Sequence, residues 1–288
     1  MNQNISIAAT LAVRNRAETT LNCIRELADQ LSRYPGSRII VVDDASTDGT
    51  PGRIEAEYPD VQVIRADGDQ YWGGAMKIAE AAALQTNFTH LLWVNDDASL
   101  ASDAVSRLVE TSVRHGVNRT IATGAMSWPH QHRLTSYSGA RRKTRLGLMR
   151  LVTVDPSDED TSVDATNGNL VLIPRQAIIE LSGLDRRFTH RFGDYDFSMR
   201  AAHAGYLVML APGFLGETPR NGNNGTHLDR HASRRERLRR LRSKKGLPFG
   251  QKAAYLRRHG GLSWPVQLIV MHSYHVARAL AIPVRDSQ

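Results

Sequence analysis

Residues 39–51 read Ile39-Ile40-Val41-Val42-Asp43-Asp44-Ala45-Ser46-Thr47-Asp48-Gly49-Thr50-Pro51, an apolar run that ends in acidic and hydroxyl side chains. Four successive apolar residues favour a strand that is covered on both faces, as in a parallel sheet. Asp48 and the early proline Pro51 are typical of a helix start. The stretch therefore predicts a strand, a polar loop and a helix, with the loop at the end of the strand where α/β sheets bind ligands.

The same alternation of apolar runs and helix-length segments continues on both sides of this stretch. Upstream, Ile5–Leu11 predicts a strand, and Ala17–Leu31 predicts a helix because its apolar residues recur at helical spacing. Downstream, Val61–Ile64 and His90–Val94 predict strands that enclose a helix over Gly74–Gln85. This order is typical of a parallel sheet built from βαβ units.

The pattern becomes less regular beyond residue 100. Helices are predicted over Ser102–His115 and Arg175–Leu181, among strands at Thr120–Ser127, Leu151–Val154, Leu170–Ile173 and Tyr206–Leu210. Glycine, asparagine and proline dominate Gly213–Thr226, which predicts a flexible boundary. We expect a Rossmann-like α/β domain over residues 1–220 and a basic, mainly helical region over residues 221–288.

The formal charge of +8 is concentrated in one part of the chain. Between Asp229 and Arg258 there are 12 Lys or Arg and 2 Asp or Glu, so the rest of the chain carries 25 basic and 27 acidic residues. Such a local patch indicates one anionic partner and says little about chemistry elsewhere. A nucleic-acid-binding protein that acts through this basic region is one alternative that it leaves open.

The lack of a targeting signal and the single cysteine predict a protein of a reducing compartment. The apolar stretches are strand-sized, whereas a membrane-spanning helix needs roughly 20 apolar residues. The N-terminus lacks the basic and apolar regions of a secretory signal. Cys23 is the single cysteine and is expected to be buried. These features predict a cytoplasmic protein.

An acidic cluster, Asn95-Asp96-Asp97, follows the predicted strand His90–Val94. Adjacent carboxylates repel each other unless a cation lies between them. Oxygen ligands suit Mg²⁺ or Mn²⁺, and an ion with few protein ligands keeps positions open for a diphosphate. A plain surface turn is the competing interpretation, but its position at a strand end favours a metal site.

Two further acidic clusters lie at similar places. In the first cluster, the plainer interpretation is a strand end and a helix cap in which Ser46, Thr47 or Asp48 satisfies free amides. The functional interpretation is that Asp44 accepts hydrogen bonds from a base or ribose. In Gly193-Asp194-Tyr195-Asp196, Asp194 is a candidate general base for an attacking hydroxyl, and Asp196 a candidate for orienting or contacting the acceptor. Asp194 as a simple helix cap is the alternative.

Together these motifs resemble the family 2 glycosyltransferases of the GT-A fold. The resemblance runs from about Ile5 to Gly213 and rests on four ordered motifs: Thr10-Leu11-Ala12-Val13-Arg14-Asn15-Arg16, Val42 to Thr50, Asn95-Asp96-Asp97 and Gly193-Asp194-Tyr195-Asp196. It implies a mixed α/β sheet flanked by helices, and an inverting transfer of a sugar from a nucleoside-diphosphate sugar to an acceptor hydroxyl. The setting that it implies is cell-surface polysaccharide or glycolipid assembly.

The resemblance also implies roles for individual residues. The predicted donor-nucleotide contacts are Thr10, Arg14, Asp44, Asn95 and Asp96. Asn95-Asp96-Asp97 matches the family's DxD motif with asparagine in first place, which leaves Asp97 as the metal ligand, and His227 matches a metal-binding histidine that follows the base. The predicted sugar and acceptor contacts are Trp72, Gly73, Asn167 and Asp196, and Asp194 matches the catalytic base. Packing and turn formation are the plainer alternatives for Trp72 and Asn167.

The basic C-terminal segment suggests a partner of its own. Arg234–Leu241 is a basic helical stretch, and Trp264–Ile282 is apolar on much of its surface but too polar to span a membrane. We expect peripheral contact with the inner face of the membrane and a lipid-linked or glycan acceptor, with a homodimer interface as the alternative. A nucleotidyltransferase, or a relative that binds sugar without catalysis, are the remaining alternatives.

Overall fold

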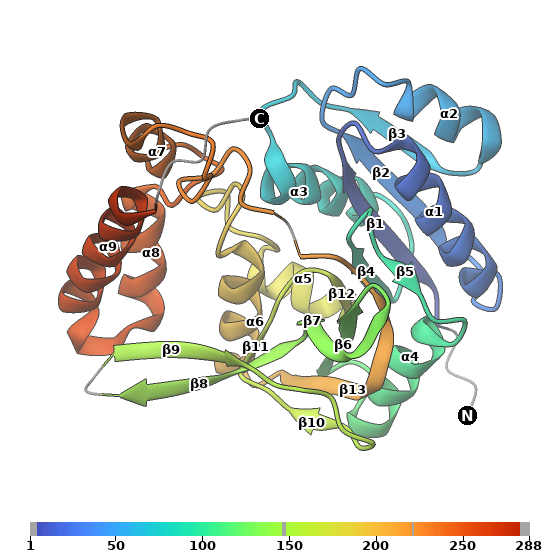
Figure 1. Ribbon diagram of the computed structural model, residues 1–288. Helices are drawn as coiled ribbons and strands as arrows, with labels where there is room; N and C mark the ends of the chain where they lie inside the picture. Colours follow the sequence, from blue (N-terminus) through green and yellow to red (C-terminus); the bar gives the residue numbers. More distant parts are fainter. Residues whose placement is uncertain (1–4, 146–147, 221, 283–288) are drawn as a thin grey trace.

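The computed structural model describes residues 5–145, 148–220 and 222–282, and its centre is a large mixed sheet (Figure 1). The strands β1 (Ile7–Val13), β2 (Arg38–Asp43), β3 (Gln62–Arg65) and β4 (His90–Val94) pair in parallel. The strand β12 (Leu170–Pro174) is antiparallel to both β4 and β6 (Thr120–Trp128). With β10 (Thr161–Ser162) and β13 (Leu207–Glu217), the main path runs β10-β13-β6-β12-β4-β1-β2-β3. The predicted α/β fold with a mixed sheet flanked by helices is therefore confirmed.

Helices cover both faces of the sheet because successive strand residues point to opposite sides. Ile7, Ala9 and Leu11 of β1 enter one core with α1 (Ala17–Leu31), α2 (Thr50–Glu57) and α4 (Ala104–His115). Ala8 of the same strand enters the other core with α3 (Tyr71–Leu84), α5 (Arg175–Leu181) and α6 (Gly193–His203). Cys23 is fully buried, as expected.

Helix α3 begins three residues before its predicted start at Gly74. The side chain of Asp44 accepts hydrogen bonds from the amides of Gln70 (3.1 Å) and Tyr71 (3.0 Å), which are free donors at the helix start. This cap comes from a residue 26 positions upstream, so the local sequence does not show it.

Strand β13 (Leu207–Glu217) runs through the first part of the predicted flexible boundary Gly213–Thr226. Its pairing with β6 shifts register between Leu210 and Phe214, and Gly213 has a φ of 58°. A glycine in this left-handed conformation fits a bulge, so the residue that suggests a loop here is part of a bent strand.

A second, three-stranded sheet lies beside the first. It has the order β11-β8-β9 and contains β8 (Gly139–Arg145), β9 (Leu148–Thr153) and β11 (Ala165–Thr166). Polar sequences hide several strands from sequence analysis, because both faces of such strands lack the apolar alternation on which prediction depends. These strands are β5 (Ser99–Leu100), β7 (Gln131–Tyr137), β8 and β10 (Thr161–Ser162).

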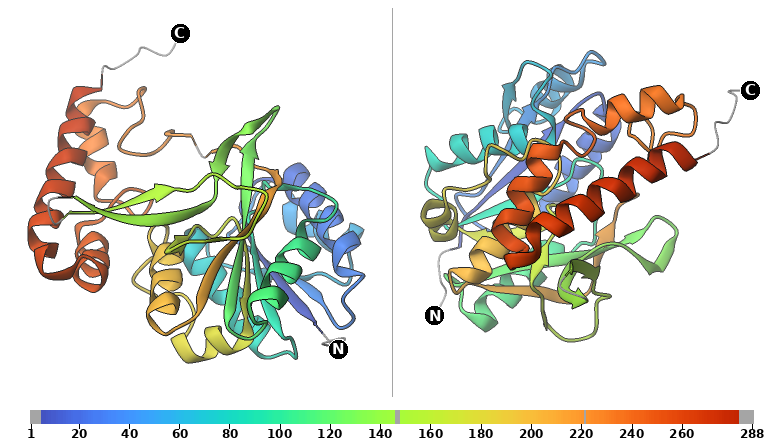
Figure 2. Two further views of the ribbon diagram at one scale, coloured as in Figure 1. Left: turned by 90° about the horizontal axis from the view of Figure 1, so that it is seen from below. Right: turned by 90° about the vertical axis from the view of Figure 1, so that its left-hand side faces the viewer.

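The C-terminal region forms α7 (Arg234–Leu241), α8 (Phe249–His259), a 3₁₀ turn (Gly261–Ser263) and α9 (Trp264–Ala281). Figure 2 shows these helices set apart from the main sheet, with β8 and β9 reaching across to them. Residue 221 and residues 283–288 of the predicted region lie outside the described part of the chain. Within the described residues, no helix combines the length and apolar character that crossing a bilayer requires.

Asp196 joins α6 to α8. Its side chain is fully buried; one oxygen accepts from Nε of Arg200 (2.8 Å), and the other accepts from Nη1 of Arg258 (2.6 Å) and Nε2 of His259 (2.9 Å). Burial alone would raise the pKa of Asp196, but these three partners hold it below its ordinary value. With its side chain fully buried and paired, Asp196 joins the two helices and is not placed to contact an acceptor. Two of its three partners, Arg258 and His259, lie 62 and 63 residues later in the chain, so the local sequence does not show them.

We expect Asp196→Ala to lower the free energy of unfolding by about 3–5 kcal/mol, because Arg200, Arg258 and the buried His259 lose the buried carboxylate that they share. Urea denaturation at pH 7 measures this, with the exposed Asp60→Ala as control. Since the folded-state pKa lies below the ordinary value of 3.8, the contribution of Asp196 should persist at neutral pH and disappear as the pH falls below about 4. Equal unfolding midpoints for the two variants would contradict this role.

Candidate active site

The carboxylates of Asp96 and Asp97 lie side by side where β4 ends, and Arg16 bridges them. Its Nη1 atom is 2.7 Å from Oδ2 of Asp97 and 3.2 Å from Oδ1 of Asp96. Burial raises the pKa of Asp96 to about 7 and also raises that of Asp97, and Arg16 offsets only part of this effect. Within the described residues, the buried Oδ1 atom of Asp97 has no hydrogen-bond partner. The acid pair therefore remains short of positive charge.

Asp194 is the second residue of α6, and its carboxylate is held by two backbone amides. Oδ1 accepts from Tyr195 N (2.8 Å), and Oδ2 accepts from Gly168 N (3.0 Å). Burial raises the pKa of Asp194, although the two amides and Arg191 act in the opposite direction. A raised pKa brings this carboxyl group closer to neutral pH, which suits a general base.

The turn Asn167-Gly168-Asn169 connects Asp194 to the acid pair. While Gly168 donates to Asp194, the carbonyl of Asn169 accepts from the amide of Asn95 at 2.9 Å. The side chain of Asn167 closes the turn by donating to Ser138 O (2.6 Å) and accepting from Asn169 N (3.1 Å). The predicted residues Asn95, Asn167 and Asp194 are thus brought together by one short turn.

Trp72 and Gly73 pack the start of α3 against this region. A Cβ atom on Gly168 would lie 2.2 Å from the ring of Trp72, which also meets Trp93 edge to face at 5.9 Å between ring centroids. Gly73 N donates to Thr189 O at 2.7 Å, and a Cβ on Gly73 would lie 2.3 Å from Phe188 O. These contacts hold the loop at residues 188–189, just ahead of Asp194.

The predicted nucleotide contacts near β1 and β2 have different environments. Arg14 is half exposed, donates to Gly68 O at 2.5 Å and lies 3.8 Å from Oδ2 of Asp44. The carboxylate of Asp44 accepts from the amides at the start of α3, a contact that sequence analysis did not predict. Thr10 is fully buried and donates to Leu92 O at 3.2 Å, which places it inside the sheet beneath the site instead of in contact with solvent.

His227 lies apart from the acid pair. It is buried, and its Nε2 atom is 3.1 Å from Nδ1 of His275 on α9. Burial, together with Arg191, Arg278 and Lys252, lowers the pKa of His227 to about 4. Over the described ranges, no group of three or more His, Cys, Asp or Glu side chains is placed to hold one metal ion. The structure therefore does not unite His227 with Asp97 in one ligand set.

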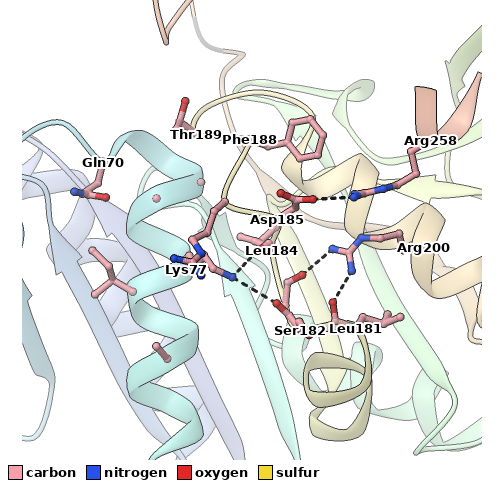
Figure 3. Close-up of a pocket in the computed structure, with 16 residues that line it drawn as sticks. Gln70, Lys77, Leu181, Ser182, Leu184, Asp185, Phe188, Thr189, Arg200 and Arg258 are labelled. Atoms are coloured by element: carbon pink, nitrogen blue, oxygen red, sulfur yellow. Dashed lines mark hydrogen bonds and ion pairs between the residues drawn. The ribbon is translucent and has the colours of Figure 1, made fainter. Parts of the chain in front are cut away.

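A separate cavity of about 770 Å³ lies between α3 and the segment at residues 181–189 (Figure 3). Its lining residues do not include Asp97 or Asp194. Lys77 donates to the carbonyls of Ser182 and Leu184, and Arg200 donates to those of Leu181 and Gly183. These cations are used to hold the loop, so we assign no catalytic role to this cavity.

Sequence analysis quoted Arg16 within a motif but gave it no role. A basic residue immediately before the helix Ala17–Leu31 is unfavourable for the helix dipole, which prefers negative charge at that end. That mismatch is the signal that points to an acidic partner for Arg16. Asn169 carries no comparable signal, although both side-chain amide atoms are buried without a partner in the described part of the chain.

Three solved structures share the fold of this chain. A mannosyltransferase, PcManGT from Pyrobaculum calidifontis, in complex with GDP-Man and Mn²⁺, has a TM-score of 0.58 and 16% identity over 98% of this chain and 74% of its own. GalNAc-T7 with UDP, GalNAc and Mn²⁺ has a TM-score of 0.58 and 14% identity over 94% of this chain and 55% of its own. TarS residues 1–349 from S. aureus has a TM-score of 0.55 and 12% identity over 96% of this chain and 81% of its own.

Sequence comparison gives the family. No curated protein matches the chain. The profile of glycosyl transferase family 2 matches residues 10–147, a range that contains Arg16, Asp44 and the acid pair. Over these residues the chain matches glycosyl transferase family 2, and its fold is that of the GT-A glycosyltransferases.

Proposed function

We propose that this protein is an inverting, metal-dependent glycosyltransferase. It transfers a hexosyl or deoxyhexosyl group from a nucleoside-diphosphate sugar to an acceptor hydroxyl in cell-surface polysaccharide or glycolipid assembly. The observation that carries the proposal is the turn at Asn167–Asn169, which binds the loop of the acid pair on one side and Asp194 on the other. Two fold relatives contain a nucleotide or nucleotide sugar with Mn²⁺, which supports a donor of this class.

The acid pair fits a divalent metal ion. Asp97 has a buried oxygen without a partner in the described residues, and the raised pKa of Asp96 shows that Arg16 alone does not compensate the two carboxylates. Carboxylate oxygens are suitable ligands for Mn²⁺ or Mg²⁺. When bound, the ion would neutralise the negative charge that develops on the departing diphosphate. We assign it to Asp97 and Asp96, and leave His227 out of this ligand set.

Arg16 occupies the place of a counter-ion while the metal is absent. A metal ion at Oδ1 of Asp97 would bring a second cation close to this guanidinium, and because the two repel each other we expect Arg16 to move away from the acid pair when the metal binds. A displaced guanidinium at the start of α1 is positioned to contact a phosphate group, which Arg binds well. We therefore propose that Arg16 stabilises the acid pair in the free protein and the donor diphosphate in the complex.

Asp194 acts as the general base in this proposal. The amides of Gly168 and Tyr195 fix the direction of its carboxylate, and burial strengthens it as a base. It would take the proton from the acceptor hydroxyl, on the side of the sugar opposite to the departing diphosphate. Arg14, Asn95 and the loop ordered by Asp44 would bind the nucleotide, while Trp72, Gly73 and Asn167 would border the sugar.

The surface of α9 supports peripheral membrane contact. Val266, Ile269, Val270 and Tyr274 are exposed at helical spacing on one face. The basic helix α7 packs beside α9, so apolar and cationic side chains lie close together. This combination suits the interface of an anionic bilayer and a lipid-linked acceptor.

Calorimetric titration with UDP, dTDP and GDP, each with and without Mn²⁺, tests the donor site. We expect one nucleotide to bind in a metal-dependent way and this binding to disappear in Asp97→Ala but not in the exposed Asp60→Ala. Failure of all three nucleotides to bind would sink the proposed function.

Asp194→Asn tests the base. We expect kcat to fall by a factor of about 10² to 10⁴, with little change in nucleotide Kd, because the amide cannot take a proton. Steady-state kinetics with the nucleotide sugar identified by calorimetry measure this effect. Unchanged kcat would assign the chemistry to another residue, and an inactive wild-type protein would indicate a sugar-binding relative.

Arg16→Met tests the counter-ion. Without nucleotide, we expect its Mn²⁺ affinity to rise about tenfold, because the metal no longer displaces a guanidinium. Nucleotide affinity at saturating Mn²⁺ should fall. Metal titration followed by calorimetry measures both, with the exposed Arg25→Met on α1 as control. Weaker Mn²⁺ binding in Arg16→Met would show that Arg16 supports the site in another way.

A further inference from the structure

The C-terminal helices bury two cations that have no carboxylate partner. Lys252 on α8 is fully buried, and its ammonium group contacts Nδ1 of His272 at 2.7 Å. Arg237 on α7 is also fully buried, and its three guanidinium nitrogens lack partners in the described residues. A buried unpaired charge costs several kcal/mol, and arginine does not escape the cost by losing its proton. This part of the fold is therefore short of negative charge.

The nearby acids do not supply that charge. The stretch from Asp229 to Arg258 contains 12 basic residues and 2 acidic ones. Asp229 is bound to Arg240 at 2.7 Å, and Glu236 is bound to Arg239 and Arg240 at 2.8 Å each. Both acids of this stretch are thus already used within it.

Lys252 belongs to a cluster of cationic and imidazole groups. His227 contacts His275 at 3.1 Å, and Lys252 contacts His272, which lies three residues before His275 on α9. The charges of Arg191, Arg278 and Lys252 also lower the pKa values of His227 and His275. Arg191 and Arg278 are exposed, His272 and His275 are half-buried, and Lys252 and His227 are buried. We call the exposed residues Arg191 and Arg278 the rim of the cluster and the buried residues Lys252 and His227 its floor. In the floor, Nδ1 of His227 is buried without a partner in the described ranges.

This cluster adjoins Asp194. Phe192, which lies between Arg191 and Asp194 in the sequence, stacks on Tyr255 of α8 at 4.8 Å between ring centroids. The segment that leads into Asp194 therefore lies against the helix that carries Lys252. The acid pair lies on the far side of the turn at Asn167–Asn169, where Asn95 is bound. The cationic cluster thus lies beside the segment that carries the proposed base, whereas the proposed donor diphosphate belongs to the acid pair.

We propose that Arg191, His227, Lys252 and His275 form a subsite for a phosphate or diphosphate group carried by the acceptor. The inference rests on the proposed function, since Asp194 defines the acceptor side. Phosphate oxygens accept charge-assisted hydrogen bonds from Lys and Arg and hydrogen bonds from imidazole N–H groups, so one anion would satisfy the rim and the floor together. Lipid-linked diphosphates and phosphate-bearing polyols share this chemistry.

Inorganic pyrophosphate is the probe that tests the subsite. It is titrated by calorimetry into the full-length protein in EDTA, which removes metal from the acid pair. We expect saturable binding that weakens at least about tenfold in Lys252→Met and in Arg191→Gln, a loss of ~1.4 kcal/mol or more. Asp97→Ala and the exposed Arg25→Met should bind like the wild type. Arg191 is exposed, so its variant keeps the test valid if Lys252→Met fails to fold.

Several outcomes would overturn the subsite. They are an absence of saturable binding, unchanged binding in Arg191→Gln, and a loss of binding in Asp97→Ala, which would place the anion at the donor site. Displacement of pyrophosphate by geranyl diphosphate supports a lipid-linked acceptor, and displacement by glycerol 3-phosphate supports a polyol phosphate. Displacement by inorganic phosphate alone would indicate a free ion and overturn the acceptor assignment. Metal-dependent nucleotide binding without pyrophosphate binding sinks the subsite and leaves the proposed function intact.

Discussion

The close approach between Gly168 and Trp72 is the constraint on which the site depends. No side chain fits at Gly168, because a Cβ there would lie 2.2 Å from the indole ring. The turn is therefore pressed against the start of α3, and from that position its amide reaches Asp194 and its neighbour's carbonyl reaches Asn95. The antiparallel strand β12 makes this possible, because it begins beside the end of β4 and delivers the turn there. The loop that carries Asn95 and the helix start that carries Asp194 are far apart in the sequence, and the turn thus holds them in fixed positions relative to each other.

The site combines two charge deficits of opposite sign. At the end of β4, buried carboxylates lack positive charge even with Arg16 present, as the pKa of Asp96 at about 7 shows. Beside α8 and α9, buried Lys252 and Arg237 lack negative charge. Neither arrangement stabilises the folded protein by itself, since burying an unpaired charge is unfavourable. Under the proposed function, a metal ion would compensate the carboxylates and a phosphate group would compensate Lys252, so binding energy would be concentrated where the charges are buried.

Sequence patterns predicted those features whose causes lie within a few residues of each other. The spans of α1, β4 and α5 follow from local periodicity, and the acidic clusters at strand ends follow from the sheet pattern. The strands β7 and β8 escaped prediction because their polar residues are organised by pairing with neighbours. Asp196 and His227 were given site roles because their partners, Arg258, His259 and His275, lie 48 to 63 residues away. Arg16 is the intermediate case, since the helix dipole made its position unfavourable without identifying Asp97.

The buried Asp196 clamp gives the C-terminal helices a reason to be part of the enzyme. Asp194 and Asp196 lie on the first turn of α6, and Arg258, His259 and Lys252 lie on α8. Because Asp196 accepts from Arg258 and His259, it fixes α8 against the helix that carries the proposed base. The same contact therefore sets where Lys252 stands relative to Asp194. A structural ion pair in this position would allow a late, basic part of the chain to complete the proposed acceptor site, whose other residues lie on the α/β sheet.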